Sequence, residues 1–246
     1  MITSWSPSKL EKYTQCPLRC KLETVDKLCP ICFQGAMKGW EVQTCTKCGG
    51  SPAPSPVLQR GTALHLAAEN YIAGKDRAMH ADLAPVKAWV EKYRHGFKTG
   101  FVRVEQQIAV TKEWEQCEWF SPKAWLRTKI DVLDMTGKKI WYVVDWKTGK
   151  FKPDGEYSDA LNIYATAIMS AFPQPGAVES SLVFIDAGKA VERPEGRVNR
   201  KGVKKAQKNW VARTKAMLSD EIFAPKPSNL CRWCPYSKAK GGVCEY

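Results

Sequence analysis

The sequence predicts an α/β or α+β protein with a central mixed β-sheet flanked by helices. Segments with apolar residues at helical spacing alternate with strand-like segments, in the order helix, helix, strands, helix, strand, helix. The hydrophobic fraction of 44% is ordinary for a globular chain. A length of 246 residues suits one sizeable domain with a small insert.

The elements follow from local patterns along the chain. A first helix is expected to begin at Pro7, with Ser6 as its N-cap residue. Apolar residues at helical spacing predict further helices over residues 59–72, 82–95, 157–171 and 203–218. Strand-like runs cover residues 101–110, 114–120, 124–133, 139–146 and 180–186. The Pro- and Cys-rich segment 225–246 is predicted to be irregular.

Charge and cysteine content narrow the function classes. The formal net charge of +13, from 38 basic and 25 acidic residues, suits a polyanionic partner, although basic proteins that bind no nucleic acid are common. The N-terminus lacks the apolar core of a signal peptide, and no run reaches the roughly 18 apolar residues of a membrane span. We therefore expect a cytosolic protein without membrane contact, in which ten cysteines indicate metal ligands rather than disulfides.

The most informative stretch is residues 127–150, which reads as two strands joined by a turn. Asp131 lies on the first strand, and Asp145-Trp146-Lys147 lies on the second. Residues two apart on a strand point to the same face, so Asp145 and Lys147 project together and Trp146 offers only its backbone there. A three-residue loop places Asp131 opposite Asp145, whereas a two-residue loop shifts it by a few positions.

Two carboxylates at such a place can share a divalent cation. Mg²⁺ and Mn²⁺ prefer oxygen ligands, and either ion polarises a scissile phosphate and lowers the pKa of bound water. Lys147 can orient that water or offset charge on phosphorus. His65 and Glu69, one helical turn apart, and Glu105 on a strand are further candidates. The alternative is a solvated hairpin beside a structural histidine.

These motifs resemble the RecB-like PD-(D/E)xK nucleases, which include the AddB nuclease domain and the CRISPR-associated exonucleases with an iron–sulfur cluster. The resemblance rests on SPSKLEKYTQCPLRCKL, GTALHLAAE, RTKIDVLD, VVDWKTGK, DALNIYA and CRWCPYSKAKGGVC. It implies a restriction-endonuclease-like core. It places the family's histidine motif on His65, its first acidic motif on Asp131 and its D/E-x-K motif on Asp145 and Lys147. We add the backbone carbonyl of Trp146 as a metal ligand.

The family usually continues with a helix that carries Gln-Leu-x-x-Tyr. Leu161 and Tyr164 fit this pattern, but Ala160 occupies the glutamine position. Asn162 or Asp159 are candidate replacements, although Asn162 lies on a different helix face. Tyr164 is expected either to contact DNA, to support the active site or to be a core residue.

The resemblance also implies how the cysteines divide. In the iron–sulfur members, one cysteine of an N-terminal Cys-Pro motif joins three near the C-terminus to bind a [4Fe–4S] cluster. The corresponding positions are Cys16, Cys231, Cys234 and Cys244. Such a cluster would clasp the two chain ends together. Zinc in the same sites and reduced thiols are the alternatives, and Cys20, interpreted as a core residue, is a rival to Cys16.

A second set of cysteines forms two CxxC pairs that 12 residues separate. Its members are Cys29, Cys32, Cys45 and Cys48. This spacing suits tetrahedral zinc with four sulfur ligands. The intervening segment is too short and polar to bury a core, so the metal would supply the folding energy. Trp40, Lys38 and Lys47 are candidate DNA contacts, and a purely structural role is the alternative.

A basic run precedes and enters the last predicted helix. It includes Arg200, Lys201, Lys204 and Lys205, which are candidate contacts to DNA phosphates. A solvated helix face is the alternative.

We expect a nuclease domain made of residues 1–25 and 54–246, ending in the cysteine segment 225–246, and a zinc-binding insert over residues 26–53. The expected function is a metal-dependent DNA exonuclease that acts on single strands or duplex ends, in recombination, repair or phage DNA processing. A non-catalytic DNA-binding or recombination accessory module and a structure-specific endonuclease are the alternatives. Besides DNA, a single-strand annealing protein or a recombinase is an expected partner, in the cytosol of a bacterium or of a phage-infected host.

Overall fold

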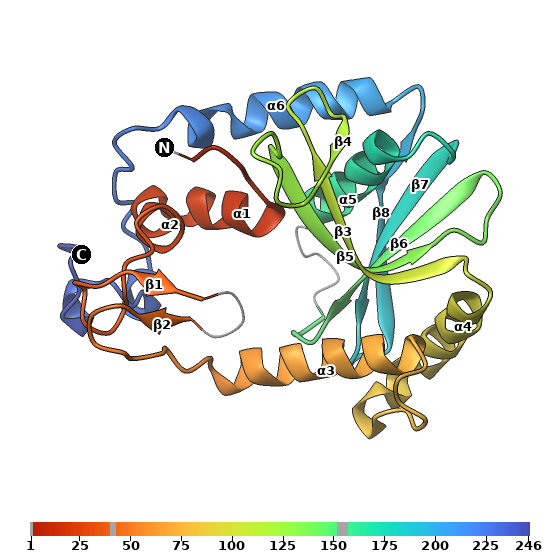
Figure 1. The fold of residues 1–246 in the computed structure, drawn as a ribbon, viewed down its shortest axis with the longest axis horizontal. Coiled ribbons are helices and arrows are strands. Elements are labelled where there is room, and N and C mark those ends of the chain that lie inside the picture. Colours follow the sequence, from red (N-terminus) through yellow and green to blue (C-terminus); the bar gives the residue numbers. More distant parts are fainter. Residues whose placement is uncertain (1, 40–42, 152–156) are drawn as a thin grey trace. The chain divides into compact units, whose positions relative to one another are not determined.

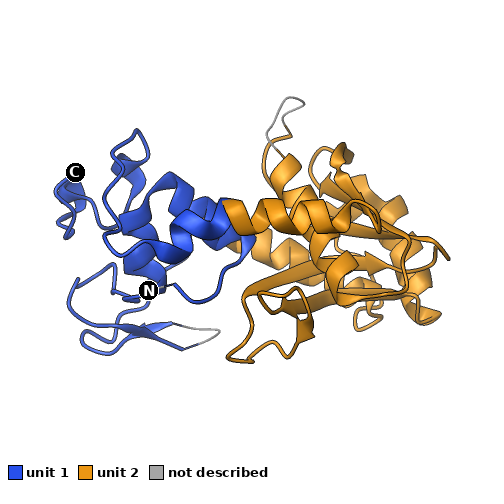
Figure 2. Ribbon diagram, turned by 90° about the horizontal axis from the view of Figure 1, so that it is seen from above, with its two compact units in different colours: residues 1–54, 213–246 blue, residues 55–212 orange. Residues whose placement is uncertain are grey.

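The computed structural model describes residues 2–39, 43–151 and 157–246 (Figure 1). These form two compact units, described separately below: residues 1–54 with 213–246 make unit 1, and residues 55–212 make unit 2 (Figure 2). The predicted division into a nuclease domain and an insert stays a prediction. Trp40, a candidate DNA contact, lies outside the described residues. Within those residues, no helix combines the length and apolar character needed to cross a membrane.

Unit 2 is built on a six-stranded mixed sheet in the order β4-β3-β5-β6-β7-β8. The strands are β3 (Val102–Val110), β4 (Gln116–Cys117), β5 (Leu126–Asp134), β6 (Ile140–Lys147), β7 (Ala177–Phe184) and β8 (Lys189–Asn199). The β6–β7 pair is parallel, and the other neighbouring pairs are antiparallel. The sheet and the helices around it confirm the predicted fold class.

Three helical segments pack on one face of this sheet. They are α3 (Pro56–Ile72), η1 (Ala81–Val86) and α4 (Lys87–Lys98). Their apolar side chains share a core cluster with Val132, Val144 and Trp146 of the sheet. Because side chains alternate along a strand, Asp131 and Asp145 belong to the opposite face. The single helix predicted over residues 82–95 is instead the 3₁₀ turn η1 followed by α4, since Pro85 lacks a backbone N–H.

Helix α5 (Ser158–Ala171) connects the parallel strands β6 and β7 and packs against β7 and β8. A parallel pair requires such a crossover. Helix α6 (Val203–Ser219) presents one buried stripe at helical spacing. The stripe consists of Val203, Gln207, Trp210, Thr214 and Met217. Both helices begin within two residues of their predicted starts.

The two edges of the sheet depart from the prediction. Strand β8 was not expected, because it contains the strand breakers Pro194 and Gly196; an edge strand tolerates both. The β7–β8 register shifts between Glu179 and Ser181, which accommodates the extra residues. At the other edge, β4 covers two residues rather than 114–120. The interruption lies at Trp114, whose φ is +65°.

Unit 1 contains short elements and the two chain ends. They are α1 (Pro7–Gln15), α2 (Pro17–Thr24), β1 (Met37–Lys38), β2 (Thr44–Cys45), η2 (Cys231–Trp233) and η3 (Lys238–Lys240). The Ser6 hydroxyl accepts the backbone N–H of Lys9 at 3.2 Å, which confirms the predicted N-cap. Apart from η2 and η3, residues 225–246 are irregular, as predicted.

Candidate functional site

The β5–β6 hairpin brings the two predicted carboxylates together. Val132 pairs with Val144, so the next position in register places Asp131 opposite Asp145. This is the closer of the two arrangements expected from the sequence. Residues 135–139 make the turn, and a side chain at Gly137 would overlap the carbonyl oxygen of Ile140. The turn therefore requires glycine at this position to close in this register.

Asp145 is a buried carboxylate, with only 7% of the residue exposed. Its Oδ1 accepts a hydrogen bond from the Tyr164 hydroxyl of α5 at 3.1 Å, and its Oδ2 forms an ion pair with the Lys147 ammonium. Burial is the main cause that raises the pKa of Asp145; Lys147 opposes the rise and the charge of Asp131 adds to it. Positive charge beside Asp145 therefore favours its ionised form.

Asp131 is fixed by contacts from two directions. Its Oδ2 accepts the backbone N–H of Trp146 at 2.7 Å and lies 3.3 Å from Nδ1 of His65 on α3. Burial alone would lower the pKa of His65, but the hydrogen bond and charge of Asp131, with the charge of Asp145, raise it overall. The Trp146 indole packs edge-on against Tyr93 at 6.2 Å, within the core cluster on the other sheet face.

The structure thus joins His65, Asp131, Asp145, Lys147 and Tyr164 into one contiguous cluster. Helix α5, which has Ala160 at the position of the family's glutamine, contributes Tyr164 to this cluster.

The remaining sequence candidates have partners elsewhere. Glu69 forms an ion pair with Lys75 at 2.9 Å, and Glu105 forms one with Lys129. The Asn162 amide donates to the carbonyl of Glu195 at 2.7 Å and accepts from Nε1 of Trp210 at 2.8 Å. Roles for Glu69 and Glu105 as supporting carboxylates stay predictions.

Arg60 is a residue of this region that sequence reasoning did not identify. Its guanidinium forms a fork with the Asp186 carboxylate, with Nη1–Oδ2 at 3.1 Å and Nη2–Oδ1 at 2.7 Å. A side chain at Gly61 would come within 3.1 Å of Oγ1 of Thr148, directly after the Asp145-x-Lys147 motif. Helix α3, which carries His65, is therefore fastened beside the end of β6. No local sequence pattern predicts an ion pair with a residue 126 positions away.

The donor set of the cluster fits Mg²⁺ or Mn²⁺. Two carboxylates and one imidazole are ligand types that these ions accept, with His65 favouring Mn²⁺. Burial raises the pKa of Asp145, and a bound dication would favour its ionised form. The ligand role of the Trp146 carbonyl stays a prediction.

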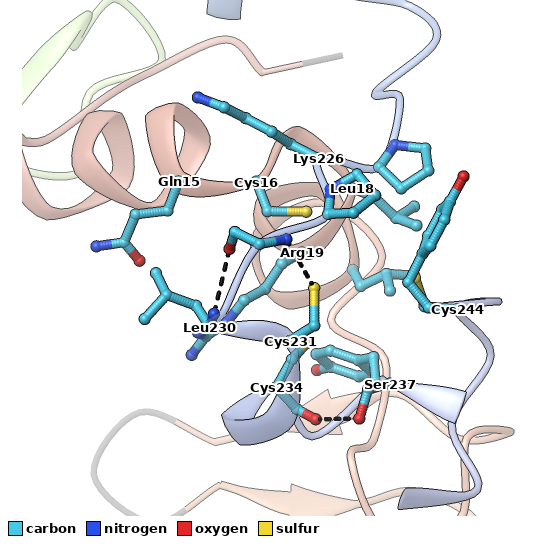
Figure 3. Close-up of a pocket in the computed structure, with 16 residues that line it drawn as sticks. Gln15, Cys16, Leu18, Arg19, Lys226, Leu230, Cys231, Cys234, Ser237 and Cys244 are labelled. Atoms are coloured by element: carbon cyan, nitrogen blue, oxygen red, sulfur yellow. Dashed lines mark hydrogen bonds between the residues drawn. The ribbon is translucent and has the colours of Figure 1, made fainter. Parts of the chain in front are cut away.

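In unit 1, one pocket is lined by all four cysteines that the resemblance assigns to a cluster (Figure 3). They are Cys16, Cys231, Cys234 and Cys244. The side chain of Cys231 points toward the sulfur of Cys16, although the chain separates the two residues widely. Cys20 is fully buried, with its sulfur 3.7 Å from the carbonyl of Lys9, and does not line the pocket.

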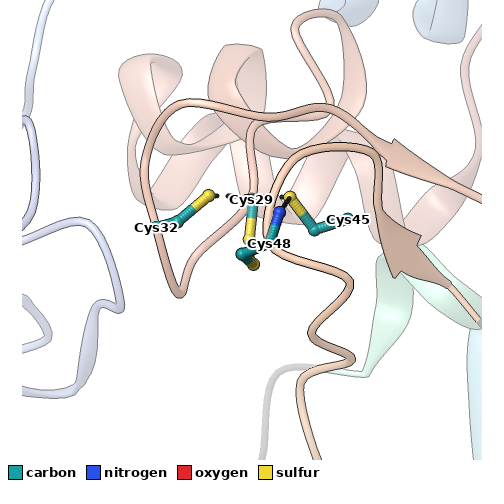
Figure 4. Close-up of side chains that lie close together, drawn as sticks. All are labelled: Cys29, Cys32, Cys45 and Cys48. Atoms are coloured by element: carbon teal, nitrogen blue, oxygen red, sulfur yellow. Dashed lines mark hydrogen bonds between the residues drawn. The ribbon is translucent and has the colours of Figure 1, made fainter.

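The tetracysteine group, made of Cys29, Cys32, Cys45 and Cys48 of the two CxxC pairs, is gathered much more tightly (Figure 4). Its sulfurs all lie within 4.8 Å of one another, with Cys29–Cys48 at 3.9 Å and Cys32–Cys45 at 3.6 Å. Four sulfurs around zinc at about 2.3 Å are about 3.8 Å apart, so these distances suit one zinc ion. In the part of the chain that the structure describes, this is the one group of at least three possible metal ligands with such spacing.

The surroundings of the tetracysteine group also suit a metal. Backbone N–H groups of Cys48 and Lys47 point at the sulfur of Cys45, at 3.4 and 3.3 Å. They lower the pKa of that thiol to about 6, with the Cys48 N–H the larger cause, which favours a thiolate ligand. A side chain at Gly35 would overlap the same sulfur, so the loop closes around it.

The predicted DNA-binding residues divide into two kinds. Lys201, Lys204 and Lys205 are exposed at the start of α6. Arg200 is also exposed, but its guanidinium donates to the carbonyls of Pro175 at 2.9 Å and Met169 at 2.6 Å, and to that of Phe172. It thus ties down the chain that leaves α5.

Comparisons with known proteins address the family. Among solved structures, the crystal structure of SSO0001 aligns with a TM-score of 0.46 and 12% identity, covering 100% of this chain and 87% of that chain. No curated protein sequence matches the chain. The family model for the PD-(D/E)XK nuclease superfamily matches residues 4–239, a range that contains the His65, Asp131 and Asp145-x-Lys147 cluster. The chain belongs to the PD-(D/E)XK nuclease superfamily.

Proposed function

We propose that the protein is a metal-dependent DNA exonuclease that hydrolyses phosphodiester bonds at single-stranded or duplex ends. The observation that carries the proposal is the contact of Asp145 with both Lys147 and Tyr164, beside the Asp131–His65 pair. The preference for ends, the RecB-like subgroup and a setting in recombination, repair or phage DNA processing come from the resemblance. So do a cytosolic location and a recombinase or single-strand annealing protein as partner.

Each residue of the cluster has a definite task in this proposal. Asp131, Asp145 and His65 would hold Mg²⁺ or Mn²⁺, and the bound ion would polarise the phosphate and lower the pKa of bound water. The Tyr164 hydroxyl and the Trp146 N–H orient the two carboxylates. The Lys147 ammonium orients the attacking water and offsets the negative charge that develops on the phosphate oxygens.

The two cysteine sets are proposed to hold different groups. The sulfur–sulfur distances of 3.9 Å for Cys29–Cys48 and 3.6 Å for Cys32–Cys45 support structural zinc. The cysteines of the other set line a pocket without gathering that closely. A [4Fe–4S] cluster places its own atoms between its ligand sulfurs, so this wider arrangement supports the cluster over a single zinc ion.

The function is tested with linear and circular DNA of the same sequence, in both single-stranded and duplex form, with and without Mn²⁺ or Mg²⁺. We expect degradation of linear DNA that depends on the metal and spares circles. Asp145→Asn and Lys147→Ala should each reduce it about hundredfold or more. Lys139→Ala, which changes an exposed lysine just before the same strand, is the matched control.

Equal cleavage of circles would favour a structure-specific endonuclease. DNA binding by the parent protein without hydrolysis under any of these metals would favour a non-catalytic accessory module. Undiminished hydrolysis by Asp145→Asn would contradict the assigned site.

A further inference from the structure

Trp233 ends the short turn η2 with 67% of its surface exposed to solvent. In the sequence it directly precedes Cys234 and follows Cys231 by two positions, and both cysteines line the pocket of unit 1. The active-site cluster does not include it. An indole offers a large flat π surface, so its exposure at a fixed point of the fold indicates a ligand with a matching flat face.

The turn that carries Trp233 is internally braced. The backbone N–H of Cys231 donates to Ser228 at 2.9 Å, that of Trp233 to Leu230 at 3.0 Å, and that of Cys234 to Cys231 at 3.0 Å. Binding of a ligand at Trp233 would therefore cost little backbone conformational entropy.

The segment that carries this ring is basic. The guanidinium carbon of Arg232 lies 5.5 Å from the centroid of the Trp233 ring. The backbone N–H and the hydroxyl of Ser237 both donate to the carbonyl of Cys234, so the helical turn η3 starts shortly after η2. Exposed Lys238 and Lys240 lie in η3. Residues 225–246 carry four basic side chains against one acidic side chain. An apolar protein surface would be a poor partner for this setting, whereas a polyanion with exposed π faces fits it.

We propose that Trp233 is a stacking platform for an unpaired base of single-stranded DNA, with Arg232 near the adjoining phosphates. The inference rests on the proposed function for the choice of DNA as ligand and narrows it to unpaired strands. A base stacks on the indole irrespective of sequence, because every base has a π face. Paired bases inside a duplex cannot reach it.

The test measures equilibrium binding of the full-length protein to fluorescently labelled oligothymidine and to a duplex of equal length, without added Mg²⁺ or Mn²⁺. Trp233→Ala should weaken binding to the single strand about tenfold. Trp233→Phe should keep most of the affinity because it keeps a π face, and duplex binding should not change. The matched control, Ile222→Ala, removes an apolar side chain that is 85% exposed in the same unit.

Parent-like single-strand affinity of Trp233→Ala would overturn the proposal, as would an equal loss for the duplex or for Ile222→Ala. Loss of self-association or of a protein contact in Trp233→Ala, with DNA affinity intact, would assign the surface to a protein partner instead. Binding is read without hydrolysis, so failure here is distinct from a failure of Asp145→Asn to abolish nuclease activity.

Discussion

The hydroxyl of Tyr236 donates a hydrogen bond to the backbone carbonyl of Leu28 at 2.8 Å. Tyr236 is 2% exposed and lines the cysteine pocket, and its own carbonyl accepts the N–H of Cys244. Leu28 directly precedes Cys29 of the tetracysteine group, and Phe33 packs edge-on against the Tyr236 ring. One side chain therefore connects the two cysteine sets of unit 1.

Tyr236→Phe removes this hydrogen bond and keeps the ring. We expect a loss of about 1 kcal/mol in the stability of unit 1, because the Leu28 carbonyl loses its buried donor. The iron or zinc content of the C-terminal pocket should fall as well, measured by elemental analysis of the purified protein. Tyr246→Phe makes the same chemical change on a half-exposed ring of the same pocket and should leave both quantities unchanged. Equal metal content in the two variants would argue against the connection.

Removal of a ligand from the tetracysteine group should unfold its loop. Cys45→Ser is expected to release one zinc per chain and to expose the segment around β1 and β2 to proteolysis, because the metal supplies most of its folding energy. Elemental analysis and limited proteolysis measure the two effects. Cys117→Ser changes a cysteine of unit 2 and should retain the zinc. Full zinc content in Cys45→Ser would contradict the assignment.

Tyr164→Phe deletes the hydroxyl that bonds Oδ1 of Asp145. A carboxylate freed in this way is less well oriented, and we expect metal-dependent hydrolysis to fall about tenfold while DNA affinity is kept. The Mn²⁺ concentration for half-maximal activity should rise. Tyr142→Phe, at a partly exposed tyrosine of β6, is the control. A Tyr164 variant with parent-like rate and metal dependence would limit this residue to core packing.

Asp134 is a fully buried carboxylate whose Oδ2 lies 2.9 Å from the Lys92 ammonium of α4. Burial opposes its ionisation, but hydrogen bonds from Thr136 and the charge of Lys92 lower its pKa overall. A depressed pKa stabilises the fold above the unfolded value near 3.9, and this stabilisation disappears as the pH falls through the folded value.

Lys92→Ala should therefore cost about 2 kcal/mol of unfolding free energy at neutral pH. The deficit relative to the parent should shrink as the pH falls through the lowered pKa of folded Asp134. Urea denaturation across this pH range measures it, with Lys87→Ala on the same helix as control. A deficit that does not depend on pH would show that Lys92 acts through packing alone.

The local parts of the site follow from the sequence because local rules govern them. Alternation along β6 and a turn with glycine fix the hairpin, so the side of the sheet reached by Asp145 and Lys147 is predictable from residues 127–150. The approach of His65 to Asp131 crosses from a helix to a strand 66 positions away. The residue type made His65 a candidate ligand, and the family resemblance assigned it to the same site as Asp131.

The parts that were missed depend on tertiary partners. Strand β8 reads as a loop because Pro194 and Gly196 interrupt it, and it forms because β7 offers an open edge. The fork between Arg60 and Asp186 and the bond from Tyr236 to Leu28 join residues far apart in the chain. Their side chains look like ordinary surface or aromatic residues until the fold brings the partners together.

The three carbonyls that hold Arg200 have a consequence for the ionic-strength dependence of DNA binding. Each lysine that neutralises a phosphate releases a condensed counterion and contributes about 0.9 to the slope of log affinity against log salt. Lys204→Gln or Lys205→Gln should thus each flatten that slope by nearly one. Arg200→Gln should flatten the slope by less and should also lower stability, because the Arg200 guanidinium already donates to backbone carbonyls and is not free to bind a phosphate closely. The basic run therefore offers fewer side chains for direct phosphate contacts than its composition suggests.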